Sequence, residues 1–361
     1  MTGSASGALT VLAATGIATV QDRGRPGLLA QGLSRGGAVD PVALAEGAAL
    51  LGQPADLAAI ELMSASLRLR ADAPVRIALT GAPMRATLTH AGDTRPLAWN
   101  ASHAVPARAE IALTPGPEGG FGYLHIGGGI ATAQVMGSRS AHLAGGLGTP
   151  LAAGDTLPLG PDKGGPVDLM IDPLPRFGGG TLRAVETLQT SLYDADQIAR
   201  LQATRFLRDS HGNRMGVRLN LDGAAPFGTE AGLTVVSDIV QPGDIQITGD
   251  GTPFLLLCEC QTTGGYPRIA TVLPCDLPIA AQAAPGAALS IRLVDRPQAL
   301  AALREAAAAL ATLPRRVRPR LRDPAQITDL LAYTLVGGVV DAARPDHLPL
   351  HLEFDPRGDL P

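Results

Sequence analysis

The chain has 361 residues, of which 45% are hydrophobic, 17% are charged and 3% are aromatic, and its formal net charge is −4. This length allows two or three domains, and the composition supplies a sizeable aliphatic core. The slight negative charge, without any basic block, argues against nucleic acid as a partner.

The N-terminal segment holds no positive residue before Arg23, so it lacks the charged region that opens a signal peptide. No uninterrupted apolar run reaches the roughly 18 residues that a membrane-spanning helix needs. We therefore expect a soluble, cytoplasmic chain that does not engage a membrane.

Short apolar runs separated by Gly and Pro follow one another from residue 8 to residue 295. This pattern predicts an all-β sandwich or barrel. Strands are expected at 75–81, 86–90, 109–115, 122–128, 167–172, 244–248 and 289–295. Two helices are expected inside this region, at 41–52, with Asp40 as N-cap, and at 194–207, which also starts at an Asp.

A weak repeat suggests that the β region has two related halves. Residues 151–160 and 283–293 each place a small-residue turn before an alternating strand, so each could be the last strand of its own barrel. The Gly run at 178–181 marks the boundary between the halves.

The composition changes after Pro297. Residues 297–313 are strongly helix-forming, and residues 323–338 open with Asp-Pro and end with Gly-Gly, which are helix start and stop signals. The predicted architecture is mainly β, with a few helices and an α-helical C-terminal extension. Its expected parts are an N-terminal β domain at 8–178, a C-terminal β domain at 181–295, and a helical extension and tail at 297–361.

Most motifs of familiar chemistry are missing from the sequence. It contains no GxxxxGK[ST] loop, no GxSxG elbow and no HExxH motif. Cys258, Cys260 and Cys275 have neither a second Cys pair nor a His pair at zinc spacing. We therefore expect reduced core thiols and no metal site.

The first dense polar cluster is TVQDRGRPG at 19–27. Asp22 lies between Gln21 and Arg23, and a Gly-Arg-Pro-Gly turn would present Arg25 from a loop. An Asp–Arg pair on the surface, which would stabilise the protein little, is the plain alternative.

Two further arginine-containing segments could bind an anion. In GSRS, Ser138 and Arg139 could hold one together with backbone amides, although a plain turn is equally compatible. In NRMGVRL, Arg214 and Arg218 would face one way on a strand, which suits a carboxylate or phosphate but also a solvent face.

The segment QTTGGYPR lies between two apolar runs that look like buried strands. Its residues are Gln261, Thr262, Thr263, Gly264, Gly265, Tyr266, Pro267 and Arg268. The two glycines would allow positive φ angles and close approach to a ligand, and Arg268 would offer a two-pronged clamp. Together these residues predict a polar pocket wall that suits a small amide or carboxylate.

These motifs resemble one known family. TVQDRGRPG, GGAVD, GSRS, NRMGVRL, SDIVQPGDIQI and QTTGGYPRIATV occur in the same order as in the KipA-like proteins, over roughly residues 8–295. That family includes the C subunit (PxpC) of the prokaryotic ATP-dependent 5-oxoprolinase and is related to the carboxyltransferase region of urea carboxylase. The sequence departs from the family pattern at Gly36, Ala48, Pro83 and Glu259.

The resemblance implies a fold, partners and a reaction. The fold would be two cyclophilin-like β-barrel domains. The partners would be a KipI-like (PxpB) subunit and a YcsF-type (PxpA) subunit, and the complex would open 5-oxoproline to glutamate at the expense of ATP. ATP would be shared with the partner subunit and accompanied by Mg²⁺, and the chain alone would be inactive.

The motif residues can be given roles under this hypothesis. Arg268 and Arg214 would neutralise phosphate or carboxylate charge, while Gln261, Thr262 and Thr263 would orient the amide. Glu259 or Asp22 would act as the general base.

Two other functions remain open. The chain could be a carboxyltransferase module that receives carboxybiotin from another chain. It would then need a separate biotinylated carrier, because its single lysine, Lys163, does not resemble a biotin-acceptor site. It could also be a non-catalytic protein that sequesters a KipI-like regulator.

Overall fold

The computed structural model describes residues 7–229 and 235–320. The helix expected at 323–338 and the tail after it lie outside the described residues. No helix in the described part of the chain is long and apolar enough to cross a bilayer.

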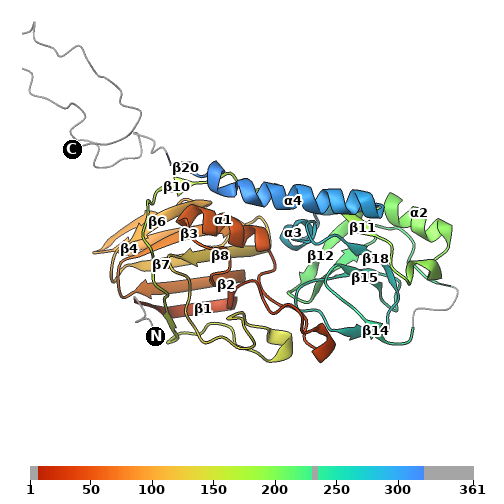
Figure 1. Ribbon diagram of the computed structural model, residues 1–361, viewed down its shortest axis with the longest axis horizontal. Helices are drawn as coiled ribbons and strands as arrows, with labels where there is room; N and C mark the ends of the chain where they lie inside the picture. The colour runs from red at the N-terminus through yellow and green to blue at the C-terminus, as the bar shows by residue number, and fades with distance from the viewer. Residues whose placement is uncertain (1–6, 230–234, 321–361) are drawn as a thin grey trace, which may run out of the picture. The chain divides into compact units, whose positions relative to one another are not determined.

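The first half of the chain, together with the short strand β20 from its other end, builds an 11-stranded sheet (Figure 1). Its strands are β1 (Ala8–Gln21), β2 (Ala59–Ala71), β3 (Val75–Gly81), β4 (Met84–His90), β5 (Asp93–Pro96), β6 (Ala101–Val105), β7 (Glu110–Pro115), β8 (Phe121–Ile126), β9 (Thr156–Pro158), β10 (Leu169–Met170) and β20 (Arg318–Pro319). The main path runs β20-β10-β6-β3-β8-β2-β7-β4-β5, and β1 pairs with β2 and β9. Because β10 and β20 have only two residues each, few hydrogen-bonded pairs hold this edge of the sheet.

The second half closes into a barrel in the order β11-β18-β15-β16-β13-β12-β19. These strands are β11 (Gly180–Val185), β12 (Phe206–Gly212), β13 (Gly216–Asn220), β15 (Asp244–Ile247), β16 (Pro253–Leu256), β18 (Arg268–Val272) and β19 (Ala288–Leu293). A separate two-stranded sheet pairs β14 (Asp238–Ile239) with β17 (Thr263–Gly264).

A late strand of each half returns to the first strand of the same half. Strand β9 pairs antiparallel with β1, and β19 pairs parallel with β11. The second of the two segments that share a turn-and-strand pattern in the sequence is therefore the last strand of its sheet, whereas β10 and β20 follow β9 in the first sheet. Only the second sheet closes into a barrel within the described residues.

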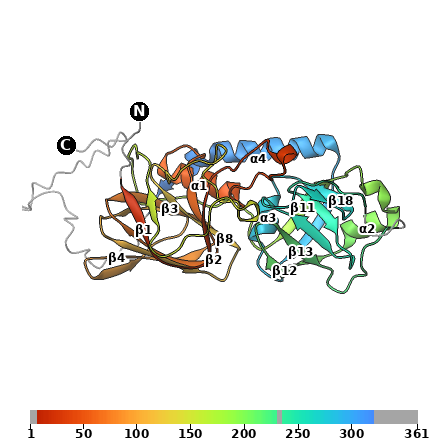
Figure 2. The same ribbon diagram turned by 90° about the horizontal axis from the view of Figure 1, so that it is seen from below.

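Four α-helices accompany the sheets in the described part of the chain. They are α1 (Pro41–Leu51), α2 (Ala195–Ala203), α3 (Leu277–Gln282) and α4 (Arg296–Arg316), and three short 3₁₀ turns lie at Leu29–Gln31, Leu143–Gly145 and Thr190–Leu192. Asp40 caps α1 through the amides of Val42 and Ala43, as its position before Pro41 predicts. Helix α4 opens with a capping box and contacts both α1 and β11 (Figures 1 and 2).

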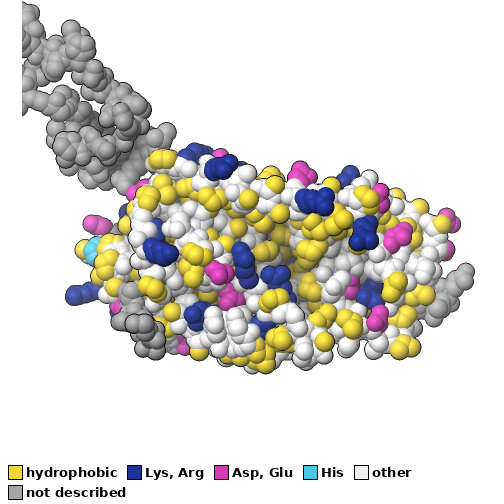
Figure 3. Space-filling view, viewed as in Figure 1, with side chains coloured by type: hydrophobic (Ala, Val, Ile, Leu, Met, Phe, Trp, Pro, Cys, Tyr) yellow, Lys and Arg dark blue, Asp and Glu magenta, His cyan; other side chains and the backbone are white. Residues whose placement is uncertain are grey.

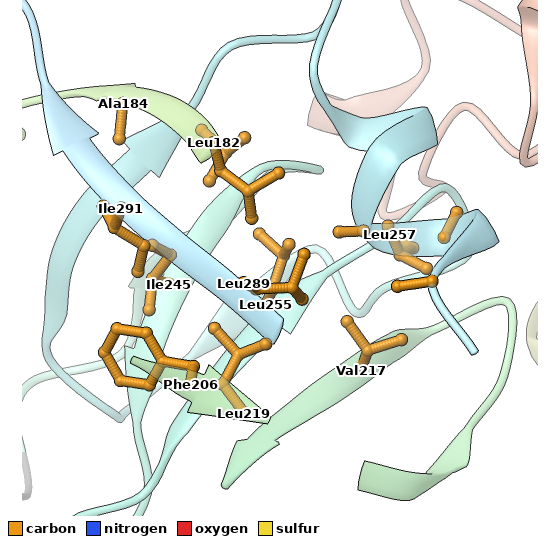
Figure 4. Packing of buried hydrophobic residues seen from close by; sticks show 14 of the residues in the cluster. Leu182, Ala184, Phe206, Val217, Leu219, Ile245, Leu255, Leu257, Leu289 and Ile291 are labelled. Carbon is orange, nitrogen blue, oxygen red and sulfur yellow. The ribbon is translucent and has the colours of Figure 1, made fainter. Parts of the chain in front are cut away.

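The barrel is filled by aliphatic side chains and few aromatic ones. Figure 4 shows side chains from several strands pointing toward one another inside it, among them Leu182, Phe206, Leu219, Ile245 and Ile291. The same cluster of buried residues also includes side chains of the first half, namely Val39, Ala43, Leu44, Ala59, Phe121 and Tyr123. The apolar core is therefore continuous from the barrel into the first half.

The mainly β architecture with a C-terminal helix confirms the fold class that the sequence predicts. Strand β3 has the expected bounds, and the helix expected at 297–313 is α4. The strand expected at 167–172 is shorter than predicted, because only Leu169–Met170 pair with a neighbour.

Candidate functional site

A cavity of about 490 Å³ lies between the first half of the chain and the barrel. The first half contributes the segment from Asp22 to Val39 and the start of α1. The barrel contributes Leu257, Cys258 and Leu277, and α4 contributes Leu310. Figure 3 shows a hollow on this face, where hydrophobic side chains gather with Lys or Arg side chains beside them. Its volume lies in the usual range for small-molecule sites.

Glycines shape the loop that borders this cavity. Gly24 and Gly37 have φ angles of +74° and +80°, and a Cβ on Gly24 would lie 2.4 Å from the carbonyl oxygen of Arg35. The amide of Arg25 donates to that same carbonyl at 2.7 Å. The two arms of the loop therefore approach so closely that only glycine fits between them.

Asp22 holds this loop against the GSRS turn. Its carboxylate accepts hydrogen bonds from the hydroxyls of Ser138 and Ser140, both at 2.5 Å, and from the amides of Gly24 and Arg139 at 2.8 and 2.7 Å. Burial opposes ionisation, but these hydrogen bonds outweigh it and lower the pKa of Asp22. A carboxylate with four donors and a low pKa is a weak general base, so the geometry disfavours that role.

Arg25 braces the same turn from the other side. Its guanidinium donates to the carbonyls of Val135 and Ser140, at 2.8 and 2.7 Å. The guanidinium of Arg139 donates to the carbonyl of Thr132. The structure thus brings together the TVQDRGRPG and GSRS motifs, which lie far apart in the sequence. Asp22, Arg25 and Ser138 bond within these two motifs, so they are engaged by the protein itself.

A buried ion-pair network begins at Glu259. Its carboxylate accepts from Arg214 Nε at 2.7 Å and from the amide of Ala144 at 3.2 Å. Arg214 also pairs with Glu61 of β2 and donates to the carbonyl of Gly37 at 2.7 Å. The hydroxyl of Tyr123 donates to Glu61 at 2.6 Å. Arg214 therefore ties the barrel to the first sheet.

From the sequence, Arg214 is expected to bind a phosphate or carboxylate of a ligand, but the structure places it among the protein's own carboxylates. The side chain of Arg214 is 3% exposed, and burial acts against its charge, but the neighbouring carboxylates outweigh burial and raise its pKa. With both carboxylates already bound, it has no charge left for a ligand's anion. It also does not share a face with Arg218, because β13 begins only at Gly216, and Arg218 pairs with exposed Asp250 instead.

The QTTGGYPR segment does not line this cavity. Arg268 pairs with Asp238 and with Asp244, the latter at 3.4 Å, and donates to the carbonyl of Ile239 at 2.7 Å. Asp244 is buried, so Arg268 neutralises a charge of its own barrel. The predicted clamp for a ligand is thus already closed on protein carboxylates.

The remaining residues of this segment bond within the second half or face solvent. The amide of Gln261 donates to Gln246 at 3.0 Å, Thr262 accepts from Val240 through its carbonyl, and Tyr266 is exposed. Thr263 and Gly264 form β17. Neither Gly264 nor Gly265 has a positive φ, which corrects that expectation. A Cβ on Gly264 would lie 2.5 Å from Gln246 Nε2, so the end of that side chain would have to move.

Cys258 lies in the cavity wall but is a poor nucleophile. Burial raises the pKa of its thiol to about 12, so the thiol stays protonated at neutral pH. Cys258, Cys260 and Cys275 are all free thiols, as the sequence predicts.

A Ser–His pair stands behind the wall and does not reach the cavity. Ser34 and His142 are both buried, with Ser34 Oγ 2.9 Å from His142 Nε2. His142 Nδ1 accepts from the amide of Gly145, so Nε2 carries the proton and donates to the serine. A histidine in this tautomer cannot take a proton from Ser34, which excludes an activated serine here.

The sequence motifs do not point to two of the lining residues. Arg23 enters them only as a neighbour of Asp22, and Arg35 lies outside them, yet both line the cavity. In the sequence, each of these two arginines stands next to a glycine turn, at Gly24 and at Gly36-Gly37. Which of the nearby arginines lines a cavity depends on the fold, so the sequence does not single them out.

Comparisons with known proteins support the family resemblance. Residues 31–293 match the family model described as carboxyltransferase domain, subdomain A and B. The chain is 30% identical over 286 residues to the C subunit of 5-oxoprolinase from Haemophilus influenzae, which covers 78% of this chain and 90% of that protein. It is 32% identical over 276 residues to the C subunit of 5-oxoprolinase from Escherichia coli, covering 74% and 86%.

A solved structure shares the fold over most of the chain. The urea carboxylase of Kluyveromyces lactis superposes with a TM-score of 0.74 at 20% identity, covering 88% of this chain and 31% of that protein. This chain thus spans less than a third of the urea carboxylase that it matches, and the likeness concerns the fold alone.

Proposed function

This chain belongs to the carboxyltransferase-domain family, subdomains A and B, and we propose from this that it is the C subunit of an ATP-dependent 5-oxoprolinase. The observation that carries the proposal is the 30% identity to the C subunit of 5-oxoprolinase across 90% of that protein. The reaction consumes 5-oxoproline, ATP and water and yields glutamate, ADP and phosphate. The chain acts as one member of the complex and is inactive alone.

The cavity between the first half and the barrel is the site that best suits the substrate. It combines apolar side chains, such as Leu44, Leu257 and Leu277, with two arginines. A five-membered lactam has apolar methylenes, one neutral amide and one carboxylate, so this mixture of surfaces is complementary to it.

Asp22 and Glu259 act as positioning residues in this proposal. Asp22 fixes the loop that carries Arg23, and Glu259 fixes Arg214 beside the carbonyl of Gly37. Each carboxylate is occupied by donors, so neither is free to take a proton from water. Gln261, Thr262, Thr263 and Arg268 support the barrel and do not contact the substrate.

ATP and Mg²⁺ enter the reaction with the partner subunit. Within residues 7–229 and 235–320, no three His, Cys, Asp or Glu side chains are grouped closely enough to hold a metal ion. We therefore assign no residue of this chain to the ion that accompanies ATP. The partners are a KipI-like subunit, which binds this chain stably, and a YcsF-type subunit.

The test is reconstitution of the complex from its three subunits. ATP hydrolysis that depends on 5-oxoproline, with glutamate as product, should require this chain together with both partners. Omission of this chain is the matched control. Equal turnover with and without it would refute the proposal, as would separate elution of this chain and the KipI-like subunit in size-exclusion chromatography at micromolar concentration.

A second function is favoured by the family description and by the urea carboxylase fold. In that case the chain would transfer a carboxyl group from carboxybiotin, carried by another protein. Carboxylation by a mixture with biotin carboxylase and a biotin carrier, without 5-oxoproline turnover, would identify it. Tight binding to a KipI-like protein without turnover in any mixture would instead identify a regulator.

A further inference from the structure

Two arginines at the cavity between the first half and the barrel hold charge that the described residues leave unpaired. Arg23 and Arg35 line the cavity and are also exposed, so they stand at its mouth. Arg35 Nε donates to the carbonyl of Arg23 at 2.9 Å, which keeps the two residues adjacent. No carboxylate within residues 7–229 and 235–320 forms an ion pair with either guanidinium.

A second cavity, of about 540 Å³, provides the contrast. It lies beside α4, and its two arginines are both neutralised. Arg176 pairs with Asp40 and Glu46 at 2.6 and 2.7 Å, and Arg183 pairs with Asp276 at 2.6 Å. The second cavity therefore offers no positive charge to a ligand, whereas the first one does.

The acidic residue of the first cavity, Asp22, forms no ion pair with Arg23 or Arg35. Its carboxylate instead accepts four hydrogen bonds from the loop and the GSRS turn, which occupy both of its oxygens. The opposite wall is apolar and includes Leu44, Leu257 and Leu277. The complementary ligand thus has a small apolar body and one anionic group.

We infer that Arg23 and Arg35 form a carboxylate subsite at the mouth of this cavity, with specificity for a compact ring that carries one carboxylate. The identity of the ligand as 5-oxoproline rests on the proposed function. The carboxylate would lie between the two guanidiniums, and the ring would lie against the leucines. A planar guanidinium can bind both carboxylate oxygens, which a lysine cannot do.

Binding to the full-length chain tests the subsite without any turnover. Isothermal titration would use 5-oxoproline, cyclopentanecarboxylate and 2-pyrrolidinone, which respectively keep both polar groups, only the carboxylate and only the lactam. The variant is the double substitution Arg23→Gln and Arg35→Gln, and the matched control is Arg85→Gln, an exposed arginine that does not line the cavity. The double variant should weaken binding of the two carboxylates by roughly ten- to a hundredfold, the range of a charge-assisted hydrogen bond. Binding of 2-pyrrolidinone should be weak and equal in all three proteins.

Kinetics of the reconstituted complex supply a second readout. Because the carboxylate is bound equally in the ground state and in the transition state, the double variant should raise KM for 5-oxoproline with a smaller change in kcat. Arg23→Lys with Arg35→Lys should recover only part of the lost affinity. Arg85→Gln should behave as the unchanged protein, and melting temperatures should agree among all variants.

The outcomes separate this inference from the proposed function. If the complex does not hydrolyse 5-oxoproline but cyclopentanecarboxylate binds in a manner that needs the two arginines, the subsite stands and the proposed function fails. If the double variant binds carboxylates as tightly as the unchanged chain, or if no carboxylate binds the chain or the complex, the subsite is refuted. Arginine-dependent binding of inorganic phosphate without carboxylate binding would also overturn it.

Discussion

Replacing Arg214 by methionine should destabilise the protein far more than the same change at Arg218. Both arginines belong to the segment NRMGVRL and both pair with acidic residues, but their burial differs. Arg214 is 3% exposed and serves Glu61, Glu259 and the carbonyl of Gly37. Arg218 is 45% exposed, and its partner is 55% exposed.

The magnitude follows from what the substitution leaves behind. Without Arg214, two carboxylates that are 1% and 2% exposed remain buried with fewer partners. Breaking a buried ion pair in this way costs about 3–5 kcal/mol of the free energy of unfolding. Glu61 keeps its donors Tyr123 and Val39, so the lower end of that range is expected. The Arg218→Met change should cost about 0–1 kcal/mol, as exposed pairs do.

Urea unfolding of the two variants provides the assay. The single tryptophan, Trp99, donates to the carbonyl of Gly81 and reports on the first sheet by fluorescence, while circular dichroism follows the whole chain. Adding Glu259→Gln to Arg214→Met should recover part of the loss, because it removes one of the stranded charges. If the two arginine variants differ by less than about 0.5 kcal/mol, the network does not hold the halves together.

Three other substitutions give equally defined results. Gly47→Ala should lower the free energy of unfolding by about 1–3 kcal/mol or more, because the new Cβ would lie 2.2 Å from the ring of His125. This clash should outweigh the better helix propensity of alanine. A variant that is more stable in urea would contradict the packing of Gly47 against His125. Burial lowers the pKa of His125 to about 3 from 6.5, so the unfolded chain binds the proton first and stability is lost as the pH falls from 6.5 toward 3. Between pH 7.5 and pH 5 this residue should account for about 2 kcal/mol, and His125→Asn should remove that part of the slope in urea titrations. Arg268→Ala should lower the free energy of unfolding by about 1–3 kcal/mol, since buried Asp244 loses its cation. Turnover per folded complex should stay the same. A variant with a normal melting temperature but lost turnover would show that QTTGGYPR takes part in the active site.

Local signals in the sequence predict the elements well, and the site less well. Strand β3 and the start of α1 follow from patterns within a few residues, such as an Asp-Pro pair or an apolar run bounded by turns. One partner of Arg214 is Glu61, 153 positions away, and no periodicity in either segment indicates that pairing. Sequence patterns therefore identify the polar segments but assign to a ligand two arginines that bind the protein's own carboxylates.

The glycines of QTTGGYPR show a related limit. A Gly-Gly pair predicts unusual backbone angles, because that is what glycine uniquely allows. In this segment the glycine instead leaves room for a neighbour, because the side chain of Gln246 occupies the space that a Cβ on Gly264 would need. Sequence alone cannot distinguish a glycine that turns the chain from one that makes room for a neighbour.

The path of α4 determines where the chain can gain or lose residues without disturbing the fold. The chain leaves the barrel at β19, runs through the 21 residues of α4 and then adds β20 to the first sheet beside β10. At 1.5 Å and 100° per residue, α4 is about 31 Å long, and its length fixes both the position and the orientation of the residues that follow it. Removal of one residue from α4 would rotate Arg318 and Pro319 by about 100° away from their partners in β10. Removal of a whole turn would keep their orientation about the helix axis but place them about 5 Å short of β10. Length variation is therefore better tolerated in the loops of the barrel than in this helix, which couples the second half to the edge of the first.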